Sequence, residues 1–414
     1  MRILINVDLR PGGTAGGVEQ FVMGLLYGLA RLRDGPEEYV LIQRRRDTSW
    51  LDPYIGPNQR IVFKPQRKMS QKLAAWVRDP AGTAWSWTRK RVFGHDWVAQ
   101  SDGFYESLGG DVIHFPFQRF IRSEVPAVFN PHDLQHLHLP EFYKRRQIAR
   151  RESTYREACR LARAVVAPTQ AVRDDLIRSF GLDPAKVWFV HHGAPTALYK
   201  SLSEEALQQV RQQYDLPAEF ALYPAQTWKH KNHIRLLQAI QLLRDRDGHR
   251  LNLICTGHKN DFWPTVEAWI EKLTLTQQIR FVGFVPAAEL RALYGLAQFA
   301  VFPSLFEGGG LPVLEAFHEG VPLACSDIPP LREYTEGAAL QFDPQSVESI
   351  AGALLAMAKD ADLRTTLRKH GQERSRIFTW ERAARKYRAL YRHVAGRVLS
   401  AEERCMLAEG PAAR

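Results

Sequence analysis

Short apolar runs alternate with amphipathic helical stretches along most of this chain, and this alternation is the feature that most restricts its fold. One set of apolar runs covers residues 3–7, 40–43, 112–115, 127–130 and 164–167. A second set covers residues 220–224, 251–256, 279–282, 299–302 and 322–325. Strands that are apolar on both faces and separated by helices are typical of parallel sheets covered on both sides. The sequence therefore predicts an α/β fold with two such sheets.

The length of 414 residues exceeds what one hydrophobic core usually supports, which also predicts two domains. The expected seam follows an apolar run at residues 187–190, where the sequence reads His192-Gly193-Ala194-Pro195. We predict a first domain over residues 1–195 and a second over 196–380. Residues 381–414 are expected to form a helix that returns to the first domain, with residues 401–414 as a frayed tail.

The formal net charge of +11 predicts an acidic partner, which could be nucleic acid, an anionic membrane surface or a phosphorylated small molecule. The apolar N-terminal run turns polar at once, and no stretch is long and apolar enough to span a bilayer. We therefore expect a cytoplasmic protein, with peripheral contact at the inner face of the membrane as a further possibility.

That possible contact involves the segment from Lys64 to Val98, in which Lys and Arg alternate with four tryptophans, Trp76, Trp85, Trp87 and Trp97. This pattern suits an anionic lipid surface. Packing of the tryptophans into the first domain is the favoured alternative. Nucleic-acid binding is the weakest interpretation, because no recognisable binding module is present.

The most informative stretch is PSLFEGGGLPVLEA, from Pro303 to Ala316, directly after the apolar run that ends at Phe302. Its three glycines allow the backbone to approach a ligand, and Pro312 suits the first position of a helix. A helix N-terminus attracts phosphate, while carboxylates such as Glu307 and Glu315 accept hydrogen bonds from sugar hydroxyls. Taken singly, Glu307 could be a solvated loop residue, and Glu315 could be a charge in the first turn of a helix. The whole string indicates a sugar-nucleotide site.

Lys231 lies at the start of a predicted helix, where a cation is unfavourable unless an anion is bound nearby. We therefore favour phosphate binding over a solvated charge. His132, His136 and His138 form a poor template for zinc, because no suitable carboxylate accompanies them. No metal site is expected.

Glu307 and Glu315, with seven residues between them and the pattern Glu-Gly-x-Gly-Leu-Pro, resemble the signature of the retaining GT-B glycosyltransferases of family four. The resemblance extends over nearly the whole chain through Gly16-Gly17-Val18-Glu19, His132-Asp133 and Phe378-Thr379-Trp380-Glu381. The run YPAQTWKHKNH at residues 223–233 resembles a subgroup associated with mannosyl transfer in polysaccharide assembly.

The resemblance implies two Rossmann-like parallel-sheet domains that face each other across a cleft, the first on the acceptor side and the second binding the nucleotide sugar. It implies that the chain transfers a hexose, with mannose favoured, from a nucleotide-diphosphate sugar such as GDP-mannose. The acceptor would be a glycan or a lipid-linked oligosaccharide in polysaccharide or lipopolysaccharide synthesis. No divalent metal or other cofactor is implied.

Roles follow from the resemblance for individual residues. Glu307 would bind hydroxyls of the donor sugar, Glu315 the ribose, and Lys231 the diphosphate. Gly17 and the amides of Gly308, Gly309, Gly310 and Leu311 would assist Lys231. His132 would lie at the reacting sugar, and Phe284 and Val285 would present backbone groups to the base.

One position departs from the family pattern. Many members have an arginine about six residues before the lysine, where this chain has Ala225. Lys229 and His230 are the candidates to supply the missing charge. Alternative functions are a nucleotide-sugar epimerase or a sugar phosphorylase on the same fold, or a basic module that binds membrane or nucleic acid.

Overall fold

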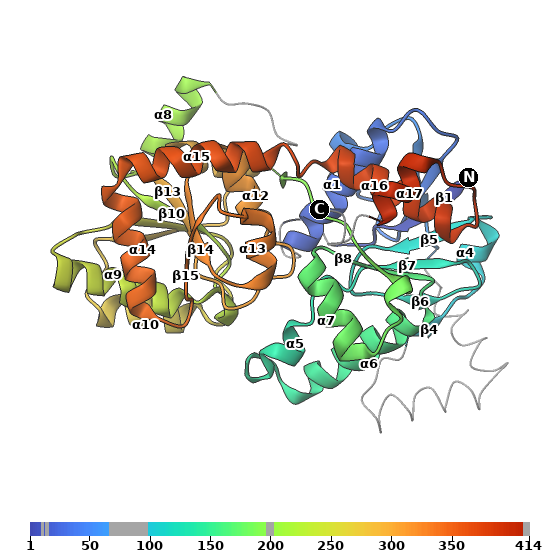
Figure 1. Cartoon of the computed structure of the whole chain (residues 1–414), viewed down its shortest axis with the longest axis horizontal. Coiled ribbons are helices and arrows are strands. Elements are labelled where there is room, and N and C mark those ends of the chain that lie inside the picture. The colour runs from blue at the N-terminus through green and yellow to red at the C-terminus, as the bar shows by residue number, and fades with distance from the viewer. Residues whose placement is uncertain (10–11, 13–15, 66–97, 196–202, 409–414) are drawn as a thin grey trace. The chain divides into compact units, whose positions relative to one another are not determined.

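The structure, a computed structural model, describes residues 1–9, 12, 16–65, 98–195 and 203–408. The chain divides into two compact units (Figure 1). The first unit contains Met1–Val190 together with Glu381–Arg414, and the second contains His191–Trp380. Each unit is built on its own parallel sheet.

The first unit contains a seven-stranded sheet with the order β3-β2-β1-β5-β7-β8-β9, in which every neighbouring pair is parallel. The strands are β1 (Arg2–Asn6), β2 (Glu38–Gln43), β3 (Gln59–Phe63), β5 (Val112–Phe115), β7 (Ala127–Phe129), β8 (Ala164–Ala167) and β9 (Val187–Phe189). A separate short pair joins β4 (Ala99–Gln100) and β6 (Ile121–Arg122).

The helices of the first unit come from both ends of the chain. They are α1 (Gly17–Arg31), α4 (Phe104–Ser107), α5 (Gln135–His138), α6 (Arg145–Leu161), α7 (Gln170–Phe180), α16 (Trp380–Val394, from Glu381 on) and α17 (Ala401–Ala408). The strand order reverses between β1 and β5, because β2 and β3 lie on one side of β1 and the later strands on the other.

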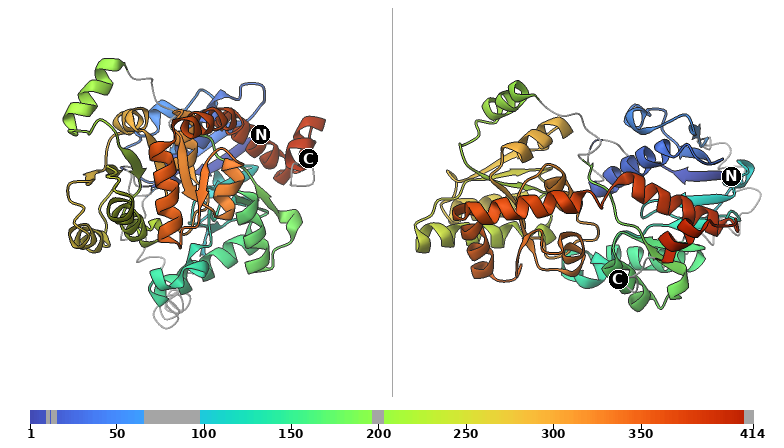
Figure 2. Two further views of the ribbon diagram at one scale, coloured as in Figure 1. Left: turned by 60° about the vertical axis from the view of Figure 1, so that its left-hand side comes forward. Right: turned by 45° about the horizontal axis from the view of Figure 1, so that its top comes forward.

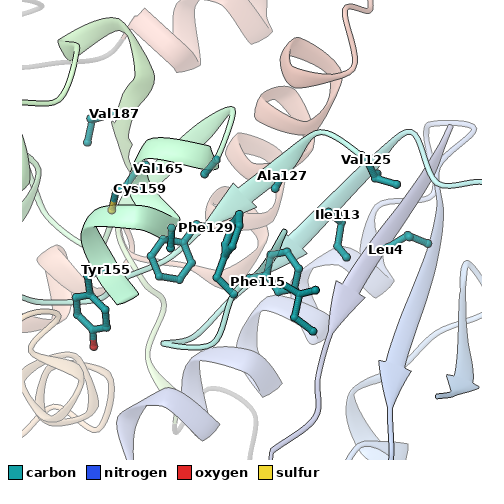
Figure 3. Close-up of a cluster of buried hydrophobic side chains, with 14 of the residues drawn as sticks. Leu4, Ile113, Phe115, Val125, Ala127, Phe129, Tyr155, Cys159, Val165 and Val187 are labelled. Carbon is teal, nitrogen blue, oxygen red and sulfur yellow. The ribbon is translucent and has the colours of Figure 1, made fainter. Parts of the chain in front are cut away.

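The core of the first unit lies between its sheet and α6 (Figure 3). Phe115 and Phe129 come from neighbouring strands, and Tyr155 and Cys159 come from α6. All four are at most 1% exposed. Continuous apolar strands are therefore buried here as the alternation in the sequence predicts.

A polar network fixes α16 on the first sheet. His114 on β5 bonds through Nε2 to Oδ1 of Asn130 at 2.6 Å, and the Tyr391 hydroxyl lies 2.7 Å from its Nδ1. The Asn130 side-chain amide donates to the Tyr387 hydroxyl at 2.8 Å. Burial lowers the pKa of His114 to about 3, so this ring is neutral and the network carries no charge.

The second unit contains a six-stranded parallel sheet with the order β12-β11-β10-β13-β14-β15. Its strands are β10 (Ala221–Pro224), β11 (Leu253–Thr256), β12 (Ile279–Gly283), β13 (Phe299–Phe302), β14 (Leu323–Ser326) and β15 (Leu340–Phe342). The order reverses between β10 and β13. Ligands of open parallel sheets bind outside the carboxyl ends of the strands at such a reversal.

Helices cover both faces of the second sheet (Figure 2). They are α8 (Glu204–Gln213), α9 (His233–Asp247), α10 (Trp263–Lys272), α11 (Ala287–Leu296), α12 (Leu311–His318), α13 (Pro329–Thr335), α14 (Val347–Lys359) and α15 (Ala361–Ser375). Helix α9 packs against α14, and α12 packs against α15. The predicted α/β class with two Rossmann-like sheets is confirmed.

The expected frayed tail is wrong for residues 401–408, which form α17. Ser400 and Glu403 cap this helix reciprocally, since the Glu403 amide donates to Ser400 Oγ and the Ser400 amide donates to Glu403 Oε2. Glu403 also pairs with Arg392 at 2.6 Å. Residues 409–414 lie outside the described part of the chain.

Candidate functional site

Lys231 and Glu307 meet at the carboxyl edge of the second sheet. Lys231 lies in the loop after β10, and Glu307 lies in the loop after β13. These two strands are hydrogen-bonded neighbours on either side of the reversal in strand order. The Lys231 ammonium lies 2.5 Å from Glu307 Oε1, and both side chains are mostly buried. Two residues that are 76 positions apart in the sequence therefore form one ion pair.

Hydrogen bonds between the two loops hold this pair in place. The Leu305 amide donates to the His230 carbonyl at 2.8 Å. The Asn232 side chain donates to the carbonyls of Pro303 at 2.9 Å and Pro344 at 2.8 Å. The buried Tyr223 hydroxyl donates to the Lys231 carbonyl at 2.5 Å. The backbone that bears Lys231 is thus anchored to the backbone that bears Glu307.

The charge of Glu307 depends on its neighbours. Burial favours the neutral acid, but the Lys231 ammonium and His230 act in the opposite direction, and the net effect is a pKa below the ordinary value. Glu307 is therefore a carboxylate near neutral pH. It can accept hydrogen bonds from hydroxyl groups, although it cannot donate any.

The glycine turn after Glu307 leads directly into α12. Gly310 has a φ of 51°, and a Cβ at this position would lie 2.9 Å from Leu331 Cδ2. Glycine is required here by both the left-handed backbone and the lack of space. Helix α12 begins at Leu311, so Pro312 occupies the second helical position and not the expected first. The N-terminal end of this helix carries a partial positive charge and can receive an anion.

Glu315 lies one turn further along α12 and is 8% exposed. The Tyr294 hydroxyl of α11 donates to its Oε2 at 2.9 Å. Burial raises the pKa of Glu315 to about 7, and nearby Glu319 acts in the same direction. This carboxyl group is therefore half protonated near neutral pH. A ligand that donates hydrogen bonds to it would favour the charged form.

Phe284 and Val285 follow β12, on the other side of β10 from Glu307. Phe284 is 53% exposed, whereas Val285 is buried. The Phe284 ring stacks on His258, with 4.5 Å between ring centroids and 6° between ring planes. Sequence reasoning did not identify His258, whose position after β11 is its only signal. The pair offers a flat aromatic surface at the same edge of the sheet.

His132 and Gly17 lie in the first unit. His132 has a φ of 68°, and its Nε2 lies 2.8 Å from the Pro116 carbonyl. A carbonyl only accepts, so Nε2 carries the proton. Burial lowers the pKa of His132, so its neutral ring has a lone pair on Nδ1 that can accept a hydrogen bond from a hydroxyl group. Gly17 is the first residue of α1. The Phe21 ring of that helix packs edge-on against the His132 ring, with 5.0 Å between the ring centroids.

The other histidines of this loop have separate surroundings. His138 Nε2 lies 2.7 Å from Asp175 Oδ2, and the buried His136 ring packs edge-on against Tyr155. Within the described ranges, no group of three or more His, Cys, Asp or Glu side chains is arranged to hold a metal ion.

Ala225, at the position of the family's arginine, is buried. Lys229 is exposed, with its ammonium 5.7 Å from the Phe262 ring centroid, whereas His230 is close enough to Glu307 to lower its pKa. Of the two candidates for the missing charge, His230 is therefore the one at the site. The segment from Lys64 to Val98, for which core packing was favoured over membrane contact, lies almost entirely outside the described residues. Among the helices that are described, none is long and apolar enough to cross a membrane.

Two family models match this chain. The model described as "Glycosyltransferase Family 4" matches residues 15–198, and the model described as "Glycosyl transferases group 1" matches residues 207–374. The first match lies almost entirely in the first unit and the second match lies within the second unit.

Two curated proteins illustrate the similarity. O-antigen chain mannosyltransferase B of Escherichia coli is 32% identical over 258 residues, which cover 62% of this chain and 67% of that protein. D-inositol 3-phosphate glycosyltransferase of Corynebacterium efficiens is 25% identical over 410 residues, which cover 92% of each chain.

A solved structure of similar fold is that of Anabaena HepE in complex with UDP and glucose. It superposes with a TM-score of 0.68 at 18% identity and covers 94% of this chain and 99% of that chain. At this level of identity the likeness concerns the fold alone.

Proposed function

This chain belongs to the family-four glycosyltransferases of GT-B fold, and from that premise we propose that it transfers a hexose from a nucleoside diphosphate sugar with retention of anomeric configuration. The favoured hexose is mannose, with GDP-mannose as donor and a glycan or lipid-linked oligosaccharide as acceptor. The similarity to O-antigen chain mannosyltransferase B supports mannose. The similarity to an inositol phosphate glycosyltransferase leaves the acceptor class open.

The Lys231–Glu307 pair is the observation on which this proposal rests most. In the absence of donor the two side chains neutralise each other, which reduces the penalty of burying either charge alone. A donor diphosphate would draw the Lys231 ammonium away from Glu307. Glu307 would then be available to accept hydrogen bonds from the donor sugar. A single binding event would thus place a cation on the leaving group and a carboxylate on the sugar.

The remaining contacts follow from the same geometry. Glu315 would accept hydrogen bonds from the ribose, and the amides of the turn at Gly308, Gly309, Gly310 and Leu311 would assist with phosphate. Backbone groups of Phe284 and Val285 would contact the base. In the first unit, His132 Nδ1 would accept a hydrogen bond from a hydroxyl of the reacting sugar or of the acceptor. The contribution of Gly17 to diphosphate binding stays a prediction.

The chemical step requires no carboxylate nucleophile. The bond between the anomeric carbon and the diphosphate oxygen breaks, and the acceptor hydroxyl oxygen bonds to that carbon on the same face. The hydroxyl proton passes to the departing phosphate oxygen. Lys231 and the α12 N-terminus stabilise the negative charge on the leaving diphosphate, so no metal ion or other cofactor is proposed. The expected compartment is the cytoplasm.

The test is a transfer assay on the full chain with a panel of nucleotide sugars, in the presence of a chelator. Proton NMR of the product determines the anomeric configuration. We expect transfer from GDP-mannose with the donor's configuration kept. An inverted product would contradict the retaining step. Interconversion of nucleotide sugars without acceptor would instead identify an epimerase, which the family matches do not favour.

A further inference from the structure

The excess of positive over negative charge in this chain is confined to one unit. The first unit contains 37 Lys and Arg residues against 24 Asp and Glu, whereas the second contains 19 against 21. The unit that bears Lys231 is therefore slightly acidic. The donor site therefore does not account for the basic character of the protein, which favours an anionic ligand of the first unit.

Arginines are concentrated at the carboxyl edge of the first sheet, beside the reversal between β1 and β5. Asp8 follows β1, the run Arg44-Arg45-Arg46 follows β2, and Arg119 follows β5. Because β2, β1 and β5 are parallel neighbours, these loops lie at one edge. Ligands of such sheets bind at this position. We call Arg44, Arg45, Arg46 and Arg119 the arginine cluster.

Asp8 holds the two sides of the arginine cluster together. Its Oδ2 lies 2.8 Å from Arg119 Nη1 and 3.5 Å from Arg44 Nε, and its Oδ1 accepts from the Arg44 amide at 3.3 Å. The buried side-chain amide of Gln43 donates to the carbonyls of Arg45 at 3.1 Å and Asp47 at 2.7 Å. The buried Gln43 side chain therefore fixes the backbone of the loop that bears Arg44, Arg45 and Arg46.

The arginine cluster has more cations than anions. Asp8 is shared by Arg44 and Arg119, and the Asp47 carboxylate accepts from Ser49. Arg45 and Arg46 are exposed and form no ion pair with any residue in the described part of the chain. Lys64, after β3, differs because Asp102 neutralises it at 2.7 Å. Uncompensated positive charge is thus present at the edge where a ligand would bind.

We infer that the arginine cluster binds a phosphate or pyrophosphate group carried by the acceptor. Guanidinium groups match the geometry of phosphate oxygens with two parallel hydrogen bonds, and they stay charged at every physiological pH. Arg45 and Arg46 make the direct contacts, and Asp8 keeps Arg44 and Arg119 beside them. This inference rests on the proposed function, since it assigns the acceptor to the first unit.

The first experiment measures binding of inorganic pyrophosphate to the full chain by titration calorimetry. The donor site is saturated beforehand with the nucleoside diphosphate that most stabilises the protein. The double variant Arg45→Gln/Arg46→Gln is compared with Arg33→Gln/Arg163→Gln, which removes two exposed arginines that precede β2 and β8 at the opposite edge. We expect about tenfold or greater loss of pyrophosphate affinity in the first variant only.

The second experiment identifies the source of the phosphate. Transfer is measured to a neutral glycan, to the same glycan with a soluble phosphate, and to the glycan on a lipid diphosphate. A selective fall in kcat/KM of Arg45→Gln/Arg46→Gln with either phosphorylated acceptor supports the inference. A fall with the lipid-linked acceptor alone assigns the phosphate to the lipid.

Three outcomes overturn the inference. The first is equal pyrophosphate affinity in the two double variants. The second is a fall in kcat/KM of Arg45→Gln/Arg46→Gln with the neutral glycan that equals its fall with the phosphorylated acceptors. The third is that this variant loses binding only to vesicles of anionic phospholipid. If the wild-type chain binds no nucleoside diphosphate and transfers no sugar, the proposed function fails instead. The two failures are therefore distinguishable.

Discussion

Glu315→Gln should change the pH dependence of folding stability. The ordinary pKa of this carboxyl group is 4.5, and burial raises it to about 7 in the folded protein. The folded state therefore binds more protons than the unfolded state between these values. It follows that wild-type stability declines as pH rises from 4.5 to 7. The full difference of 2.5 pKa units corresponds to about 3 kcal/mol.

The glutamine variant lacks this ionisation. Glutamine keeps an oxygen that can accept a hydrogen bond from Tyr294. Its amide hydrogens, however, lose in the folded state the hydrogen bonds to water that they make in the unfolded chain. We therefore expect the variant to be no more stable than wild type at about pH 5. Between about pH 5 and about pH 8.5 the stability difference should move by about 2.5 kcal/mol in favour of the variant.

The assay is urea unfolding of the full chain at several pH values. Glu271→Gln is the control, since Glu271 is exposed and forms no ion pair within the described residues. The control should follow the wild-type curve. Donor affinity should be weaker in Glu315→Gln, because the ribose loses a charged acceptor. Parallel pH profiles for wild type and Glu315→Gln would refute the reasoning that this carboxyl group is kept at a cost in stability.

Three further predictions concern other residues. Lys231→Ala should weaken nucleoside diphosphate binding by about tenfold to a hundredfold, since a charged hydrogen bond contributes about 1.5–3 kcal/mol. Calorimetry should show unchanged nucleoside binding in this variant, and the control Lys229→Ala should alter neither affinity. Equal losses of nucleoside diphosphate and nucleoside affinity in Lys231→Ala would contradict the phosphate role. His132→Asn and His132→Ala should both lower kcat/KM by about tenfold or more. Only the alanine variant should lose about 1 kcal/mol to the left-handed backbone, and near-normal activity in His132→Asn would argue against the contact. Tyr387→Phe should destabilise folding by about 1–3 kcal/mol, because the Asn130 amide loses its acceptor. An unchanged urea midpoint would contradict this.

The inner strands could be predicted from the sequence, whereas two outer strands could not. Residues 112–115, 164–167 and 299–302 match β5, β8 and β13 residue for residue. Strands β3 and β15 were missed, and both are outermost in their sheets. Only Gln59 of β3 and Phe342 of β15 are buried. These two strands therefore lack a clear apolar run, whereas β9 and β12, which are also outermost, were predicted from the runs at residues 187–190 and 279–282.

The missed helix α17 had a signal that was overlooked. Ser400 and Glu403 have the spacing of a capping box, and the structure shows both of its hydrogen bonds. The polar composition of the last residues suggested a tail, yet the ion pair with Arg392 gives this helix a tertiary anchor. Such an anchor cannot be read from a single sequence.

At the candidate site, residue types could be predicted but not their partners. Lys231 was placed at the start of a helix and Glu307 after a strand, but that β10 neighbours β13 follows from sheet order alone. Tyr294 supports Glu315 from a different helix, and Asn232 ties together two loops. Neither contact has a sequence signal, because each depends on packing between elements that are distant along the chain.

The position of a bound nucleoside diphosphate in a crystal structure of the full chain tests the central claim most directly. The account predicts that a phosphate oxygen replaces Glu307 as the partner of the Lys231 ammonium, and that Glu315 accepts hydrogen bonds from the ribose. A nucleotide bound elsewhere, with the Lys231–Glu307 ion pair intact, would contradict it.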